Sequence, residues 1–173
     1  MVRGRLRYIG YLLLLLAVLP TFSSCNNEDD LVKILTSGTP WRMSRLTVDG
    51  SSNKFDPNFW ETEAERDASL DLYNLSSSYY TVTFAGAEID GEITGNTITV
   101  RGMDSSASGT WNANASNNSM SLSLSVSGAE TDVLATIFMN GMQNVYKYSG
   151  DTNNLNLYFK DGDTTYVIGF SPQ

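Results

Sequence analysis

The chain has 173 residues with 11 basic and 19 acidic side chains, a formal net charge of −8, one cysteine and no histidine. The acidic balance excludes nucleic acid as an expected partner, because phosphate contacts need clustered Lys and Arg. Without histidine, the serine–histidine, cysteine–histidine and zinc-hydrolase mechanisms are excluded, and a single cysteine excludes an intramolecular disulfide. We therefore expect no cofactor and no catalytic residue, with only carboxylate-based hydrolysis or an oxygen-ligated cation left open.

The first 25 residues have the form of a bacterial lipoprotein signal. Three arginines within the first seven residues precede an apolar run from 11 to 19, and two serines stand directly before Cys25. The run is too short to span a bilayer, which takes roughly 20 apolar residues. We expect residues 1–24 to be cleaved as a signal peptide. Cys25 then carries acyl chains such as palmitate, which anchor the mature protein to a membrane.

A short acidic tether follows the anchor. Residues 26–30 read Asn-Asn-Glu-Asp-Asp, and this stretch resembles the acidic segment behind the lipidated cysteine in surface-displayed lipoproteins of the Bacteroidota. The resemblance implies an outer-membrane lipoprotein exposed at the cell surface, with a periplasm-facing lipoprotein as the alternative. We assign residues 25–37 to the anchor and tether, and residues 38–173 to one domain.

From Trp41 onward, apolar residues recur at a spacing of two, which is the period of a β-strand. The clearest run is Ser119–Ser127, where apolar side chains face one way and serines face the other. Further strands are predicted at residues 41–48, 80–84, 88–94, 98–100, 111–115, 155–159 and 166–170. Four residue pairs suit tight hairpin turns: Gly95–Asn96, Asn117–Asn118, Asn153–Asn154 and Asp161–Gly162.

These patterns predict a mainly β fold, a single antiparallel meander of about eight strands curled into a barrel or half-barrel that protects its edges. Residues 131–142 have apolar side chains spaced near 3.6 residues, which predicts one short helix that plugs an open end. Residues 56–74 break the strand rhythm, and we expect a loop there with room for a short helix.

Several motifs occur in a familiar order. Trp41 lies in an early strand, and it is followed by Gly91–Asn96, by Gly109–Thr110–Trp111, by the apolar helix, and by residues 145–151 leading into 155–158. In this order the sequence from Trp41 to its end resembles a META/HslJ-like domain, although Thr94–Gly95–Asn96 stands where many members have Gly-Cys-Asn. The resemblance implies a compact, β-rich, envelope-associated domain with no general catalytic activity and no functional residue to carry over.

A second resemblance is to lipocalin-like lipoproteins. Residues 38–41, Gly-Thr-Pro-Trp, are a loosened form of the Gly-x-Trp motif with which a lipocalin barrel begins. This resemblance implies a central cavity for a small apolar ligand.

Two groups of side chains are candidate sites. Phe55, Phe59 and Trp60 lie in the longest irregular segment, where aromatic rings can stack on sugars or shield an apolar ligand, or can cap the barrel as core. Glu88, Asp90 and Glu92 alternate, so on one strand their carboxylates would point the same way, roughly 7 Å apart. They could hold calcium or act as an acid/base pair. Alternatively, they could be solvent-facing charges on an edge strand, where they resist pairing with another strand.

The function expected from these features is a non-enzymatic binding or envelope-maintenance module on a lipid anchor. It would meet a protein or glycan partner through a loop end. The alternative is a lipocalin-like carrier of a small apolar ligand. A third hypothesis, from a different class, is a carboxylate hydrolase that uses Glu88, Asp90 and Glu92.

Overall fold

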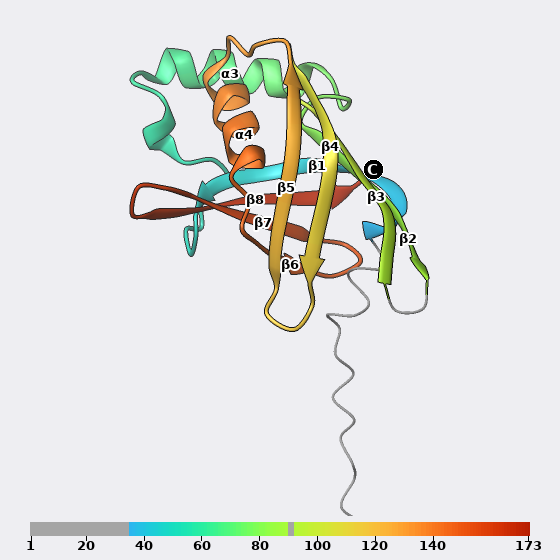
Figure 1. Cartoon of the computed structure of the whole chain (residues 1–173). Coiled ribbons are helices and arrows are strands. Elements are labelled where there is room, and N and C mark those ends of the chain that lie inside the picture. Colours follow the sequence, from blue (N-terminus) through green and yellow to red (C-terminus); the bar gives the residue numbers. More distant parts are fainter. Residues whose placement is uncertain (1–34, 90–91) are drawn as a thin grey trace, which may run out of the picture.

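The computed structural model describes residues 35–89 and 92–173, and its sheet closes into a ring (Figure 1). Eight antiparallel strands pair in chain order, and the first also pairs with the last. The strands are β1 (Ser37–Val48), β2 (Thr81–Ile89), β3 (Glu92–Arg101), β4 (Ser106–Asn114), β5 (Ser119–Ser127), β6 (Lys147–Gly150), β7 (Leu155–Asp161) and β8 (Thr164–Pro172). The predicted fold class, an antiparallel β meander that curls on itself, is confirmed.

The ring is uneven, because one of its seams is short. β4 and β5 pair over nine positions, whereas β5 and β6 pair only at Ser119 and Lys147. Two backbone hydrogen bonds of 3.0 Å, from Met120 to Tyr146 and from Tyr148 to Asn118, complete this seam. The helix α4 (Val133–Gln143) packs against β5 and β7. It therefore contacts the strands on both sides of β6, where the pairing between β5 and β6 is short.

The helix α4 confirms the one predicted at residues 131–142. The Asp132 carboxylate caps its start by accepting a 3.0 Å hydrogen bond from the Ala135 amide. Leu134, Phe138 and Met142 follow one another at a spacing of four, and all three are fully buried. The apolar spacing therefore marks the face that packs into the ring.

Large side chains fill the inside of the ring. Trp41, Tyr80, Phe84, Trp111 and Tyr148 are each 0–1% exposed. The rings of Phe84 and Trp111 pack edge to face at 5.5 Å, and the Trp111 indole N–H donates a 3.0 Å hydrogen bond to the Ala85 carbonyl. The alternation seen in the sequence thus separates an interior of aromatic and aliphatic side chains from a polar exterior.

The prediction of a single strand at residues 88–94 is wrong. β2 runs to Ile89 and β3 starts at Glu92, so the chain reverses there, and Glu88 pairs with Ile93 across the hairpin. The turn predicted at Gly95–Asn96 instead lies inside β3, where the register shifts and Gly95 has a φ of 64°. A β-bulge and a hairpin turn both use this left-handed conformation, so glycine alone does not distinguish them.

The other three predicted turns fall between strands. Asn117–Asn118 joins β4 to β5, and Asn153–Asn154 joins β6 to β7. Asp161–Gly162 joins β7 to β8. Asn118 and Gly162 have φ values of 56° and 57°, as tight turns of this kind require.

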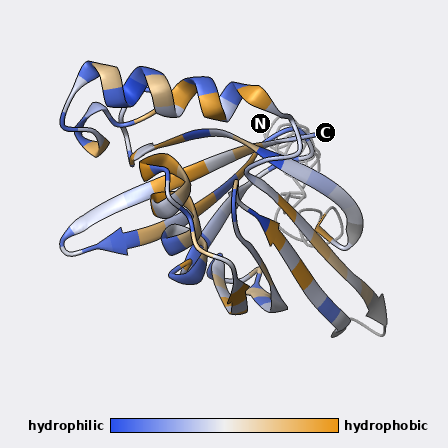
Figure 2. Ribbon diagram, turned by 90° about the horizontal axis from the view of Figure 1, so that it is seen from above, coloured by the Kyte–Doolittle hydropathy of each residue, from blue (hydrophilic) through white to orange (hydrophobic). Residues whose placement is uncertain are grey.

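The segment expected to be mainly a loop contains a second helix, α3 (Glu63–Leu75), of 13 residues. A capping box begins it, because the Thr62 hydroxyl accepts from the Glu65 amide and the Glu65 carboxylate accepts from the Thr62 amide, each at 3.2 Å. A short 3-10 helix, η1 (Pro57–Phe59), precedes it. Hydrophobic and hydrophilic residues alternate along α3 (Figure 2), as expected for a helix that packs by one face.

No helix within residues 35–89 and 92–173 has both the length and the apolarity needed to cross a membrane.

Candidate ligand-binding site

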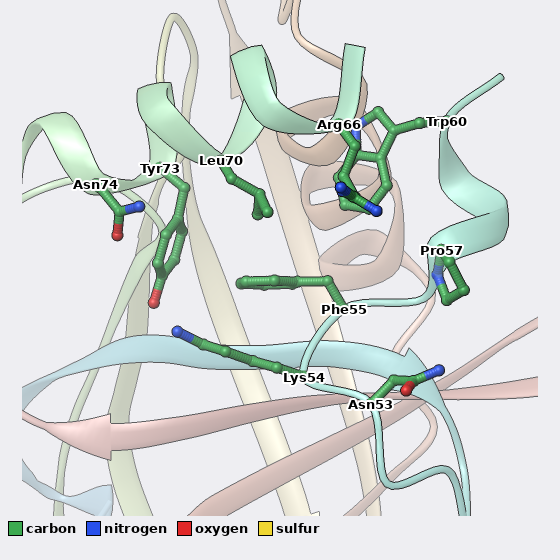
Figure 3. A pocket seen from close by; sticks show the side chains of 9 residues that line it. All are labelled: Asn53, Lys54, Phe55, Pro57, Trp60, Arg66, Leu70, Tyr73 and Asn74. Carbon is green, nitrogen blue, oxygen red and sulfur yellow. The ribbon is translucent and has the colours of Figure 1, made fainter. Parts of the chain in front are cut away.

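A pocket of about 420 Å³ lies between α3 and the loop that follows β1 (Figure 3). The loop contributes Asn53, Lys54, Phe55, Pro57 and Trp60, and α3 contributes Arg66, Leu70, Tyr73 and Asn74. Spacings of three and four residues place the helix side chains on one face of α3. The capping box at Thr62 sets where α3 begins, and so fixes which face meets the loop.

Aromatic rings make the apolar wall of the pocket. The rings of Phe55 and Tyr73 meet edge to face with centroids 5.1 Å apart. Phe55 is half-buried, whereas Trp60 is only 8% exposed. Figure 3 shows the Phe55 ring with Lys54 below it and Leu70 above it. Such a wall offers flat apolar surface on which a ring or a planar group can stack.

The charged side chains of the pocket are both cations. The Lys54 ammonium lies 5.2 Å from the Phe55 ring centroid and 5.0 Å from that of Tyr73. The Arg66 guanidinium lies on α3 and forms an exposed 3.0 Å ion pair with its neighbour Asp67. None of the nine lining residues is acidic, although the chain carries 19 acidic residues. The lining of the pocket thus carries cationic but no anionic side chains on an acidic protein.

Tyr73 joins the pocket to the core. Its hydroxyl donates a 2.8 Å hydrogen bond to the Met43 carbonyl of β1. Burial raises the pKa of the Tyr73 hydroxyl above its ordinary value, and the nearby Arg42 guanidinium opposes that rise. The Tyr73 ring packs at 5.5 Å on Tyr80, which packs at 5.5 Å on Phe138 of α4. One series of aromatic contacts thus runs from the pocket wall into the ring.

Two of the three predicted aromatic residues line the pocket. Phe55 and Trp60 do, but Phe59 lies outside the lining. The Phe59 ring instead packs 5.8 Å from Trp60 and 5.7 Å from Tyr166 of β8. Of the predicted group, Phe55 and Trp60 therefore line the pocket, and Phe59 packs against Trp60 outside the lining.

Sequence reasoning missed the contribution of α3 to the site. Arg66, Leu70 and Tyr73 reach the pocket because they share one helical face. The signal that would have found them is the Thr62–Glu65 capping pattern, which places a helix start ahead of these residues.

Two buried polar atoms on the same elements have no hydrogen-bond partner within the described residues. They are the Trp60 indole nitrogen and the Ser69 hydroxyl, on residues that are 8% and 2% exposed. A buried donor without an acceptor costs free energy. The Trp41 indole nitrogen and the Thr47 hydroxyl of β1, on residues that are each 1% exposed, likewise have no partner within the described residues, so unpartnered polar atoms do not set the loop–helix contact apart from the ring.

The acidic group Glu88, Asp90 and Glu92 does not have the arrangement predicted for it. Glu88 ends up on β2 and Glu92 on β3, so they are not successive positions of one strand. Asp90 lies outside the described residues, as does Cys25 with the rest of residues 1–34. Within the part of the chain that the structure describes, no three His, Cys, Asp or Glu residues gather as metal ligands would.

A different carboxylate, Glu130, holds the turn between β3 and β4. It accepts hydrogen bonds from the backbone amides of Met103, Asp104 and Ser105 at 3.0, 2.9 and 3.0 Å, and from the Ser105 hydroxyl at 2.6 Å. The turn packs closely on it, since a Cβ on Gly102 would lie 1.9 Å from a Glu130 carboxylate oxygen. With these four donors, Glu130 serves to fix the turn.

Comparisons with known proteins identify a family and a fold. A family model described as "Domain of unknown function (DUF4847)" matches residues 26–172, which is a different family from the META/HslJ-like one. No curated protein matches the sequence. A crystal structure of a DUF4847 family protein from Bacteroides vulgatus ATCC 8482 matches with a TM-score of 0.58 and 18% identity, over 81% of this chain and 96% of that one. At that identity the likeness shows the fold alone.

Proposed function

This chain belongs to the DUF4847 family, whose description names no function, and we propose one from its site. The protein is a lipid-anchored, non-enzymatic binding module of the cell envelope. It holds a partner molecule in the aromatic pocket between α3 and the loop after β1.

The observation that carries this proposal is the composition of the pocket wall. Phe55, Trp60 and Tyr73 come from two different elements and face one cavity. Ligand pockets are typically about 300–1,000 Å³ in volume, apolar and aromatic, with a few polar groups that orient the ligand. The polar groups here are the amides of Asn53 and Asn74 and the two cations.

The packed interior of the ring favours this outer pocket over the lipocalin-like alternative. A carrier needs an unfilled space inside its barrel, whereas here Trp41, Trp111 and Tyr148 occupy the ring. Phe138 of α4 adds to them and packs between Tyr80 and Phe170. A ligand would have to displace fully buried side chains to enter.

The absence of catalysis is proposed from the residues at hand. The sequence has no histidine, and the pocket lining holds no carboxylate that would act as a general acid or base. Lys54 and Arg66 can attract and orient an anionic group through their positive charge.

The location is proposed from the sequence. Acylation of Cys25 would hold the domain on the outer membrane, and the acidic residues after it resemble the tether of surface-displayed lipoproteins. A periplasm-facing lipoprotein is the alternative.

The proposed function is tested by native mass spectrometry of the protein extracted with mild detergent from its own host. The wild type should carry a bound mass that Phe55→Ala loses. Tyr158→Ala is the matched control, because Tyr158 is also a half-buried aromatic residue but lies on β7 and does not line the pocket. A bound mass that the Phe55→Ala variant retains would place the ligand outside this pocket. If that retained molecule were apolar, it would favour the lipocalin-like carrier.

A further inference from the structure

We propose that the pocket between α3 and the loop after β1 binds a carboxylated sugar, that is, a uronic acid residue of a glycan, in preference to a neutral sugar. This inference rests on the proposed function, because it names the ligand class of the same site.

The mixture of rings and amides suits a sugar. One face of a pyranose ring presents C–H groups that pack on an aromatic ring, and its edge presents hydroxyls that exchange hydrogen bonds with amide side chains. The half-buried Phe55 supplies the ring, and Asn53 and Asn74 supply exposed amides on opposite sides, one from the loop and one from α3. A purely apolar ligand would leave these amides unused.

The charge of the lining points to an acidic sugar. Lys54 and Arg66 both line the pocket without an acidic neighbour in the lining, on a chain with a net charge of −8. Within residues 35–89 and 92–173, the Lys54 ammonium forms no ion pair. Its contacts are with the faces of Phe55 and Tyr73. A carboxylate bound here would give Lys54 the opposite charge that it lacks.

Arg66 is available to the same ligand. Its ion pair with Asp67 joins adjacent residues, with side chains 38% and 67% exposed, and exposed pairs of this kind contribute little stability. The guanidinium fork matches the two oxygens of a carboxylate. Because Lys54 comes from the loop and Arg66 from α3, an acidic sugar in the pocket can meet a cation from either wall.

Side-chain cations and stacking rings also argue against a peptide terminus as the ligand. A terminal carboxylate of a peptide is typically captured by a nest of backbone N–H groups. A sugar acid needs both features that this lining combines, a surface for its ring and a cation for its carboxylate.

The test is isothermal titration calorimetry of the full chain in detergent with two probes, trigalacturonic acid and its carboxyl-reduced, neutral counterpart. The acidic trimer should bind more tightly, and its affinity should fall as salt is raised. Lys54→Gln and Arg66→Gln should each weaken the acidic trimer about three- to tenfold and leave the neutral trimer unchanged. Lys147→Gln is the control, since that ammonium also lies over a ring, Tyr158 at 5.4 Å, away from the pocket.

The outcomes separate this inference from the proposed function. Equal affinity for the two trimers, abolished by Phe55→Ala, would overturn the preference for an acid while the pocket remains a binding site. Binding of neither trimer would overturn the sugar class, and the native mass measurement would still test the pocket. Acidic binding that Phe55→Ala does not weaken would contradict both proposals. Circular dichroism of each variant confirms that it is folded.

Discussion

The guanidinium of Arg42 donates a 2.9 Å hydrogen bond to the backbone carbonyl of Tyr73 and lies 4.7 Å from the centroid of the same residue's ring. Arg42 belongs to β1 and Tyr73 to the last turn of α3. A second bond of 3.4 Å reaches the Ser76 carbonyl, just past the helix end. A cation therefore meets the carbonyl end of the helix dipole, and the sheet fixes where α3 ends.

Arg42→Ala should detach the end of α3 and weaken the pocket. It removes two hydrogen bonds to the helix end and a ring contact, so we expect a loss of about 1–2 kcal/mol in the free energy of unfolding. Chemical denaturation measures the loss, and the pocket ligand should bind more weakly. Arg45→Ala is the comparison, because that side chain bonds to Asn156 on β7 at 3.0 Å. An Arg42→Ala protein with unchanged ligand affinity would argue against this role.

Glu130→Ala should destabilise the protein through the turn between β3 and β4. It leaves three backbone amides and one hydroxyl without their acceptor, and uncompensated donors cost about 1–3 kcal/mol in total when some regain water. Amide hydrogen exchange should rise at Met103, Asp104 and Ser105. Asp163→Ala, in an exposed turn, should leave stability nearly unchanged, and equal losses in both variants would contradict the assignment.

The strands could be predicted because their exposed and inward-facing positions carry polar and apolar residues in alternation. In β5, serines alternate with apolar residues, and every serine from Ser119 to Ser127 is exposed. The error at residues 88–94 has a physical cause. Glu88 and Glu92 continue an alternating pattern across the chain reversal, so periodicity alone carries no sign of the turn.

The pocket could be predicted only in part, because it depends on how two elements meet. Phe55 and Trp60 stood out as aromatic residues in a polar loop. Tyr73 and Leu70 did not, since their role follows from the docking of α3 by Arg42 and by the Tyr73 hydroxyl. Contacts between residues 30 positions apart leave no local pattern in the sequence.

Cys25→Ser should remove the proposed membrane anchor. Without the thiol no acyl chain can attach, so incorporation of labelled palmitate should be lost and the protein should move from the membrane to the soluble fraction. Ser24→Ala, next to the cleavage site, keeps the thiol and should stay labelled. Retention of Cys25→Ser in the membrane fraction would show that something other than the lipid holds the protein there.

Alkaline pH should destabilise the fold through Tyr80. Burial raises the pKa of this tyrosine, and the Asp132 carboxylate, which accepts a 3.3 Å hydrogen bond from its hydroxyl, raises it further. In the unfolded chain the hydroxyl titrates near its ordinary pKa of about 10. Above that pH the unfolded state releases a proton that the folded state keeps. The stabilisation is therefore fully present below about pH 10 and is lost as pH rises, by up to about 1.4 kcal/mol for each pH unit.

Tyr80→Phe separates this effect from the general alkaline response. It removes the titrating group but keeps the ring that packs on Tyr73 and Phe138. Denaturant titrations between pH 9 and pH 11 should therefore give a shallower loss of stability for Tyr80→Phe than for the wild type. Tyr73, whose pKa burial also raises, keeps part of the slope in the variant. Identical slopes for the two proteins would mean that the Tyr80 hydroxyl ionises as readily in the folded state as in the unfolded one.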